Sequence, residues 1–469
     1  MAEMLKQQYG LTALKLWLDT GRYKDAPIVR FELQGKTGRS LETLHEWSCY
    51  AKEIGLPYRL DRRSAEGEGP YFSLPKRLIH ELGEAIWDLT ERREPLWLHL
   101  VKPYGYLGIV PWEKLLHLEG LSNPVLRLPD FIVPPPRETR RALDVVLCIS
   151  TPVSERNFPA VQYLEVVSRQ ILRAAKRKVR LHIFMDKRWR HFGHGADLGP
   201  DVRFYDAEKA ADYSVPRATS NIRDQDERVE NPWLLWMRDA LEGQSVDVVH
   251  FLCHGYFAND RGAIAVSESP VLNKDKEYAR YIGPAELTTF LTQLGAWAVG
   301  FTCIPNNYSR VGLRALADTI GQLRPGSVLH HNLADDPHAK ALGEAYRFLF
   351  SPEPEEPFVV PGDLFMYCQP HRVRGAMGAP TLISDFDLGL PPESPDISDI
   401  FEHEERVPSW LAASQRFLEQ AKLDLERDRQ GKRSSSRGAA SQRNSEDTVR
   451  QIQDIIAKTA KFSKLERKS

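Results

Sequence analysis

Two residues that could do covalent chemistry together follow consecutive apolar strands of the predicted sheet. His254 follows the run VDVVHFLC, and Cys303 follows AWAVGFT about 50 residues later. If these strands are neighbours, about 4.8 Å apart, their carboxyl ends bring the imidazole and the thiol into one crevice above the sheet. A thiol is mostly protonated at neutral pH, and an imidazole that accepts its proton makes it a nucleophile. The spacing therefore predicts a Cys-His pair for covalent catalysis.

A glycine beside the histidine adds a second element of this chemistry. The backbone N–H groups of Gly255 and Cys303 could bind the oxygen of a carbonyl under attack, because glycine permits close approach. The alternative is packing, since a lone cysteine at a strand end is usually a small buried hydrophobe. A lone His-Gly pair is likewise usually a turn. The two residues together, on successive strand ends, favour catalysis.

The flanking segments carry a family resemblance. HFLCHGYF, FTC and the later GSVLHHNLADDPHAKALGEAYRFLF resemble the CHAT group of caspase-like cysteine proteases, which are relatives of separase and the caspases. GIVPWEKLL is similar to that group's Pro-Trp-Glu signature and places it at Pro111, Trp112 and Glu113. The same tripeptide can equally be interpreted as a structural turn that joins two lobes. The resemblance covers roughly residues 1–352.

The resemblance implies a role for each matching position. His254 corresponds to the catalytic histidine, Cys303 to the nucleophile and Gly255 to the glycine of the oxyanion hole. In caspases the histidine also precedes the cysteine by about 50 residues. The caspase Q-A-C-x-G signature is absent here, because Thr302 precedes the thiol and Ile304 follows it, so cleavage after Asp is not implied.

CHAT and separase relatives more often favour a basic residue before the scissile bond. Such a preference requires an acid in the substrate pocket, and the sequence offers four candidates: Asp144, Asp260, Asp335 and Asp336. The resemblance further implies a thiol protease that cleaves a protein partner, controlled by a regulatory or sensor protein as an effector in bacterial antiviral defence. A cytoplasmic location is expected because no stretch is long and apolar enough to span a membrane, and the N-terminus lacks the apolar core of a secretory signal. The alternative function is a non-catalytic scaffold of the same fold that holds partners through its C-terminal helices.

Composition narrows the class of partner. The chain has 469 residues with 63 Lys and Arg against 64 Asp and Glu, a net charge of −1, so direct binding of nucleic acid or a membrane is not expected. The five cysteines are widely spaced and form no C-x-x-C pair, which argues against a disulfide framework or a cysteine-rich zinc site. No cofactor and no metal are expected, although His191 with His194, or His330 with His331, are weak metal candidates.

The pattern of elements predicts an α/β fold with a caspase-like, mostly parallel sheet and helices on both faces. An N-terminal α/β lobe is expected over residues 1–135, ending at the Pro-rich run VPPPRET. Within it, 40–55 reads as a helix and 75–92 as a second helix. The catalytic domain is expected over 141–352, where strands and helices alternate, with a hairpin near Gly262.

Beyond the catalytic domain the composition changes. Residues 353–406 are acidic and Pro-rich and read as a linker, and residues 407–469 read as a helical tail with apolar residues on one side. The tail is expected either to promote solubility or to dock a regulatory partner.

Overall fold

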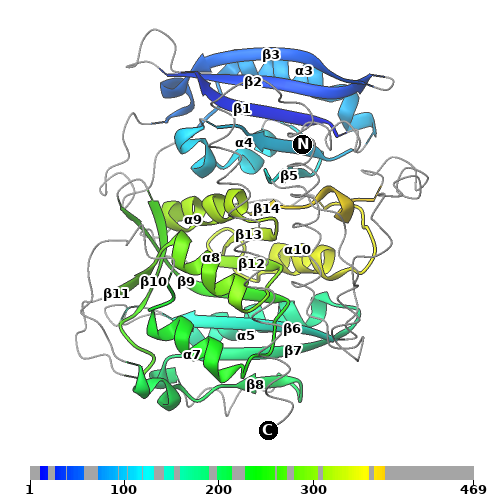
Figure 1. Ribbon diagram of the computed structural model, residues 1–469. Coiled ribbons are helices and arrows are strands. Elements are labelled where there is room, and N and C mark those ends of the chain that lie inside the picture. The colour runs from blue at the N-terminus through cyan, green and yellow to red at the C-terminus, as the bar shows by residue number, and fades with distance from the viewer. Residues whose placement is uncertain are drawn as a thin grey trace, which may run out of the picture. The chain divides into compact units, whose positions relative to one another are not determined.

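The computed structural model shows an α/β protein built on one large, mostly parallel sheet (Figure 1). Within the residues that the structure describes, fourteen strands belong to this sheet, with the main order β3-β2-β1-β4-β5-β14-β13-β12-β9-β6-β7-β8. The predicted α/β class is confirmed. The structure describes residues 11–19, 27–37, 40–56, 72–92, 94–102, 104–118, 120–130, 142–150, 152, 159–189, 198–213, 228–258, 261–271, 279–304, 310–358 and 364–374, all of which belong to one compact unit.

Six parallel strands form the part of the sheet that carries the candidate catalytic residues. They are β6 (Ala142–Ser150), β7 (Lys178–Met185), β8 (Val202–Phe204), β9 (Val248–Ala258), β12 (Ala298–Cys303) and β13 (Ser327–Asn332). Nearly every side chain of β6, β12 and β13 is buried. Strands covered on both faces have no solvent side, which explains why the sequences of β6 and β12 are nearly continuous apolar runs instead of alternating ones.

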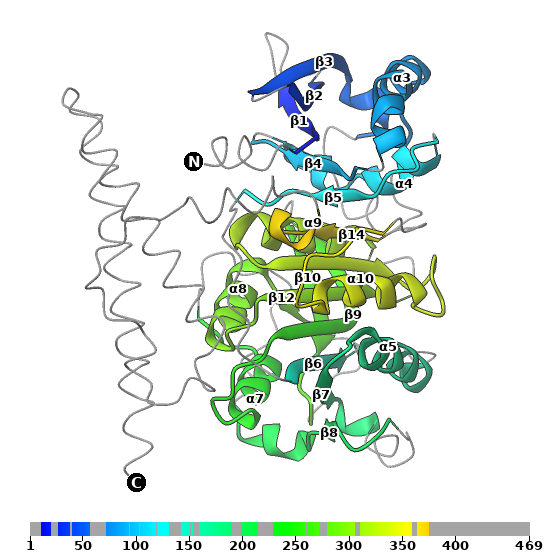
Figure 2. The ribbon, with the colours of Figure 1, turned by 90° about the vertical axis from the view of Figure 1, so that its right-hand side faces the viewer.

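Helices cover both faces of these strands, as predicted (Figure 2). The α5/α10 face is covered by α5 (Ala160–Ala174) and α10 (Lys340–Phe350), which share one apolar core with the sheet. The α7/α8/α9 face is covered by α7 (Pro232–Ala240), α8 (Pro284–Gln293) and α9 (Arg310–Leu323), which share a second core. Pro232 and Pro284 occupy the first positions of their helices, where a missing N–H costs nothing.

The N-terminal lobe continues the same sheet. Its elements are β1 (Ala13–Asp19), β2 (Ile28–Thr37), β3 (Ser40–Tyr50), α3 (Lys76–Arg92), β4 (Leu96–Leu100), α4 (Trp112–Leu118) and β5 (Val125–Arg127). Strand β5 pairs with β14, and β14 pairs with β13. The helix predicted over 75–92 is confirmed, but the helix predicted over 40–55 is wrong. That segment is an edge strand followed by a 3-10 turn (Ala51–Ile54), because pairing with β2 outweighs its local helical spacing.

The packed domain also extends beyond residue 352. Strand β14 (Phe365–Tyr367) joins the sheet between β5 and β13, and Cys368 and Val373 are buried. The predicted boundary at 352 is therefore too early, because a strand of three residues leaves no periodic pattern in a Pro-rich sequence. The rest of the predicted acidic linker and the helical tail over 407–469 lie outside the described residues.

Strand β9 continues past the main sheet and turns back as a hairpin. It pairs with β10 (Arg261–Ser267), which pairs in turn with β11 (Ala279–Ile282), so the hairpin predicted near Gly262 is confirmed. Helix α9 lies directly against this hairpin. A Cβ atom placed on Gly312 would lie 2.5 Å from the backbone oxygen of Tyr256, and one on Gly262 would overlap the backbone of α9. Glycine is needed at both positions for this contact.

We expect Gly312→Ala to destabilise the fold by about 1–3 kcal/mol, because its methyl group would push α9 away from β9. Gly83→Ala is the matched control: Gly83 lies in α3 with nothing near its Cβ position, and alanine there should stabilise by up to about 1 kcal/mol. Urea unfolding of both variants measures the two free energies. Equal effects of the two substitutions would contradict the close packing of α9 on the hairpin.

Candidate active site

His254 and Cys303 lie at the carboxyl edge of neighbouring parallel strands. Cys303 is the last residue of β12 and pairs in register with Cys253 of β9, so His254 is the next residue beyond that pair. With strands about 4.8 Å apart and a rise of about 3.3 Å per residue, the Cα atoms of His254 and Cys303 are about 6 Å apart. Gly255 follows on β9 and pairs with Ile264 of β10. The strands are thus neighbours, as the sequence argument required.

Both candidate catalytic side chains are buried. Cys303 is 1% exposed and belongs to the apolar core of the α7/α8/α9 face, together with Cys253 and Phe301. Its thiol donates to the carbonyl oxygen of Ile304 at 3.4 Å. His254 is 6% exposed. A polypeptide substrate therefore needs a rearrangement of this edge before it can meet the thiol.

Burial also sets the protonation state of the histidine. Desolvation lowers the pKa of His254 from 6.5 to about 4, because the charged imidazolium loses its hydration in the interior. At neutral pH the imidazole is therefore neutral. A neutral imidazole is the form that can accept a proton from a thiol.

The lowered pKa of His254 predicts a loss of stability in acid. The folded chain keeps the imidazole neutral down to about pH 4, whereas the unfolded chain binds a proton below about pH 6.5. Stability is therefore highest above pH 6.5 and falls as the pH drops toward 4, by about 2 kcal/mol between pH 7 and pH 5 from this residue. Urea unfolding at both pH values should show a smaller drop for His254→Gln. Identical drops would show that His254 is not held neutral by burial.

Three of the other four cysteines are poor nucleophiles. Burial raises the pKa of Cys49 and of Cys368 to about 12, and burial together with the neighbouring Cys253 raises that of Cys148 well above its usual range. These three thiols stay protonated at neutral pH, and the protonated thiol is far less nucleophilic than the thiolate. Only Cys253 and Cys303 lie beside His254, and only Cys303 ends its strand.

Of the four acids proposed for the substrate pocket, Asp144 does not lie at this edge. Asp144 lies near the start of β6, six residues before Ser150, which is the residue that aligns with Cys253. It is therefore about 20 Å from the strand ends. Asp144 bonds Arg180 at 2.5 Å and His182 at 3.1 Å, so the prediction that it lines the pocket is wrong. Asp260 lies outside the described residues.

Asp335 and Asp336 do lie at the carboxyl edge, in the turn after β13. Asn332, which pairs in register with Cys303, donates to Asp335 at 3.1 Å. Asp335 also lies 3.8 Å from Lys114 of α4 and 3.7 Å from Arg310 at the start of α9.

Asp336 has different partners. Its carboxylate accepts the backbone N–H groups of Lys340 and Ala341 at the start of α10, and the ring N–H of His331 at 3.2 Å. Although burial alone would raise the pKa of Asp336, these hydrogen bonds lower it below its usual range. The carboxylate of Asp336 is thus occupied by hydrogen bonds to α10 and His331. Among the proposed acids that the structure describes, Asp335 remains the candidate for the substrate pocket.

Beside Cys303 lies a chain of polar side chains that was not predicted from the sequence; all of its members are buried except the half-buried Asp336. Tyr346 Oη lies 2.6 Å from His250 Nδ1, and His250 Nε2 lies 2.9 Å from Thr302 Oγ1. Thr302 Oγ1 lies 3.2 Å from His331 Nδ1, whose other ring nitrogen binds Asp336. The signal in the sequence is a histidine within an otherwise apolar strand, at 250 and again in the pair His330–His331, whose sequence alone indicates at most a weak metal candidate.

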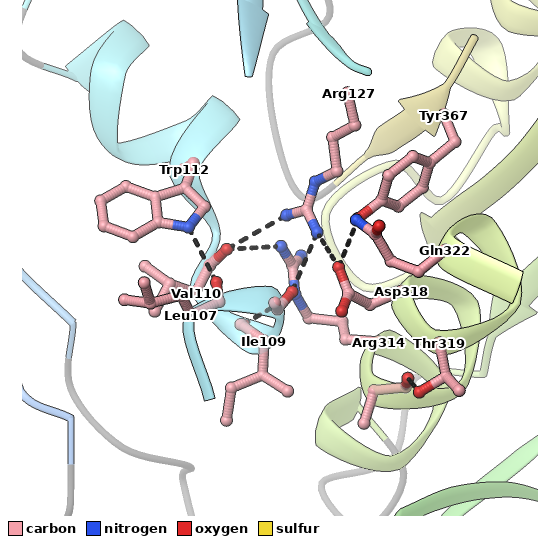
Figure 3. Close-up of polar contacts among 12 residues, drawn as sticks. Leu107, Ile109, Val110, Trp112, Arg127, Arg314, Asp318, Thr319, Gln322 and Tyr367 are labelled. Carbon is pink, nitrogen blue, oxygen red and sulfur yellow. Dashed lines mark hydrogen bonds and ion pairs between the residues drawn. The ribbon is translucent and has the colours of Figure 1, made fainter. Parts of the chain in front are cut away.

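A second buried cluster joins the N-terminal lobe to α9 (Figure 3). Glu113, in the Pro-Trp-Glu tripeptide, accepts from Arg127 at 2.7 Å and lies 3.7 Å from Arg314 of α9. Arg127 also donates to Asp318 of α9 at 3.0 Å, and Tyr367 of β14 donates to Asp318 at 2.6 Å. Glu113 thus joins the N-terminal lobe to α9, as one interpretation of the tripeptide predicted, but the predicted turn is wrong because Trp112 and Glu113 begin helix α4.

Among the described residues, no group of three or more His, Cys, Asp or Glu side chains is arranged to hold a metal ion. Within the same part of the chain, the helices are too short or too polar to cross a bilayer. The chain matches no protein-family model and no curated protein sequence.

Proposed function

We propose that this protein is a cysteine endopeptidase with a caspase-like arrangement, in which Cys303 is the nucleophile and His254 the general base and acid. The observation that carries the proposal is the register between β9 and β12. It puts the two residues at adjacent positions on the carboxyl edge of a parallel sheet, where ligands of such sheets bind. The resemblance of the flanking segments to CHAT proteases supports the same residues.

In this mechanism the thiol proton passes from Cys303 to His254 as the sulfur attacks the peptide carbonyl. The carbonyl carbon becomes tetrahedral, and its oxygen is bound by backbone N–H groups, for which Gly255 and Cys303 are the candidates. His254 then gives the proton to the leaving amine as the C–N bond breaks. Water, deprotonated by the same imidazole, hydrolyses the thioester and releases the thiol.

Preference for a basic residue before the scissile bond is part of the proposal. Asp335 is its candidate acid, because it lies on the turn that follows the residue paired with Cys303. Its contacts to Lys114 and Arg310 are long, at 3.8 and 3.7 Å, and an incoming basic side chain can compete with them.

One observation favours the alternative of a non-catalytic scaffold: both the thiol and the imidazole are buried. In a protease, this burial means that activity depends on a rearrangement, such as the binding of a regulatory partner. A scaffold would need no such step. Reactivity of Cys303 in the full chain therefore separates the two functions.

The test is labelling with a peptidyl acyloxymethyl ketone that carries arginine next to the reactive group, followed by mass spectrometry of all five cysteines. We expect faster alkylation of Cys303 than of Cys49, whose raised pKa makes it an internal reference for an unactivated thiol. His254→Gln should remove this advantage. Labelling of Cys303 that is no faster than that of Cys49, or that is unchanged in His254→Gln, contradicts the proposal and favours the scaffold.

A further inference from the structure

The buried chain beside Cys303 connects three neighbouring strands and one helix. Its five members are Tyr346, His250, Thr302, His331 and Asp336. Their side chains lie on the α5/α10 face, opposite to the thiol of Cys303, because residues alternate between faces along β12. Thr302, at the centre, is fully buried and directly precedes Cys303. It bonds β9 on one side and β13 on the other.

With a neutral His331, the chemistry of the five groups gives the chain one direction. The ionised carboxylate of Asp336 can only accept, so His331 Nε2 carries a proton and donates to it. In a neutral His331, Nδ1 must then accept, and the hydroxyl of Thr302 donates to it. The same hydroxyl oxygen accepts from His250 Nε2, which leaves His250 Nδ1 as the acceptor for Tyr346. All four hydrogen bonds thus donate in one direction, from Tyr346 of α10 through the three strands to Asp336 in the turn that precedes α10.

Burial supports this assignment at the end farthest from Asp336. Desolvation, with a smaller contribution from the neighbouring His331, lowers the pKa of His250 to about 3, so that ring is neutral and carries a single N–H. Burial also raises the pKa of Tyr346 far above its usual range, so its hydroxyl stays protonated and can donate. Each buried donor in the chain therefore has an acceptor.

Gly300 shows that the backbone accommodates this chain. It pairs in register with His250, and a Cβ atom placed on it would overlap both His250 Nδ1 and the hydroxyl of Tyr346. Glycine at this position leaves room for the hydrogen bond between strand and helix. The absence of a side chain at residue 300 therefore allows the first hydrogen bond of the chain that ends at Asp336.

We propose that Thr302, with His250 and His331 bonded to it, forms a set of positioning residues that fixes the end of β12 and so the place of Cys303 relative to His254. The inference rests on the proposed function for its effect on catalysis. Thr302 crosslinks β12 to the strand that carries His254, at the residue next to the nucleophile. Asp336, predicted from the sequence to be a pocket acid, becomes the terminal acceptor of this set.

The test compares Thr302→Val, which keeps the shape but removes the hydroxyl, with Thr302→Ser, which keeps the hydroxyl. On a fluorogenic peptide with arginine before the scissile bond, we expect Thr302→Val to lower kcat about 10- to 100-fold with KM unchanged, since a small misplacement of a reacting group has effects of this size. Thr302→Ser should stay within about threefold of the wild type. Equal kcat for Thr302→Val and wild type overturns the inference.

A second measurement does not depend on activity. In a long-range ¹H–¹⁵N spectrum of the full chain with labelled histidine, His250 and His331 should both carry their proton on Nε2, and Thr302→Val should shift both signals. A proton on His250 Nδ1 overturns the directed chain. If Thr302→Val does not fold, Tyr346→Phe is measured in its place. An unchanged kcat together with unchanged histidine signals in Tyr346→Phe overturns the inference. A lower kcat together with a shifted His250 signal supports it. A wild type that cleaves no peptide but shows both Nε2 tautomers contradicts the proposed function and leaves the chain supported.

Discussion

Cys303→Ala is expected to abolish peptide cleavage while leaving the fold intact. Without the sulfur no acyl-enzyme can form, and loss of the nucleophile in comparable enzymes lowers kcat by roughly 10⁴-fold or more. Removing one buried sulfur atom should cost only about 1 kcal/mol of unfolding free energy. Cleavage of a peptide library varied at the residue before the scissile bond, combined with urea unfolding, measures both effects.

Cys253→Ala is the matched control for this experiment. Cys253 pairs in register with Cys303, has the same burial and belongs to the same apolar core, so the two substitutions should cost similar stability. The difference is position, because Cys253 lies within β9 and Cys303 ends its strand. Cleavage should persist in Cys253→Ala. Activity retained by Cys303→Ala, or lost equally in both variants, would refute Cys303 as the nucleophile.

The parallel part of the sheet could be predicted from the sequence because its strands are long apolar runs separated by amphipathic helices. The run ALDVVLCIS over 142–150 corresponds to β6 without a shift at either end. The same logic brought His254 and Cys303 together, since both follow such runs. Strand-end chemistry in an α/β fold is therefore visible in a single sequence.

Other parts depend on contacts that a single sequence does not show. Residues 40–55 have apolar spacing suitable for a helix. Their first eleven residues nevertheless form strand β3, because they pair with β2. The error at Asp144 has another origin, because the predicted run 142–150 already places this residue near the amino end of β6, away from the carboxyl edge. Only the error over 40–55 arises because long-range pairing outweighs local preference.

The buried polar groups were the least predictable part of the site. His250 and Thr302 are 52 residues apart and meet only through the register of two strands. Arg127 and Asp318 are 191 residues apart. Polar residues in apolar runs do give a signal, because a buried polar group must be hydrogen-bonded, but the sequence does not identify the partner.

Glu113→Gln should produce a large loss of stability. Glu113 is buried and holds Arg127 through contacts of 2.7 and 3.3 Å, with Arg314 at 3.7 Å. Both arginines are buried, and burial together with the nearby Arg127 already lowers the pKa of Arg314 to about 9. Removing the carboxylate leaves two buried guanidinium groups with Asp318 as their remaining acidic partner in this cluster. We expect a loss of about 3–5 kcal/mol in unfolding free energy.

The matched control is Glu81→Gln in α3, which removes the same charge from an exposed pair with Arg77 at 2.8 Å. Exposed pairs contribute at most about 1 kcal/mol because solvent screens them, so this variant should unfold nearly as the wild type does. Urea unfolding of both variants at neutral pH gives the comparison. Equal costs would mean that the cluster is not a desolvated junction between the N-terminal lobe and α9. A large cost confined to Glu113→Gln would show that this junction fixes α9, the helix that follows Cys303 along the chain.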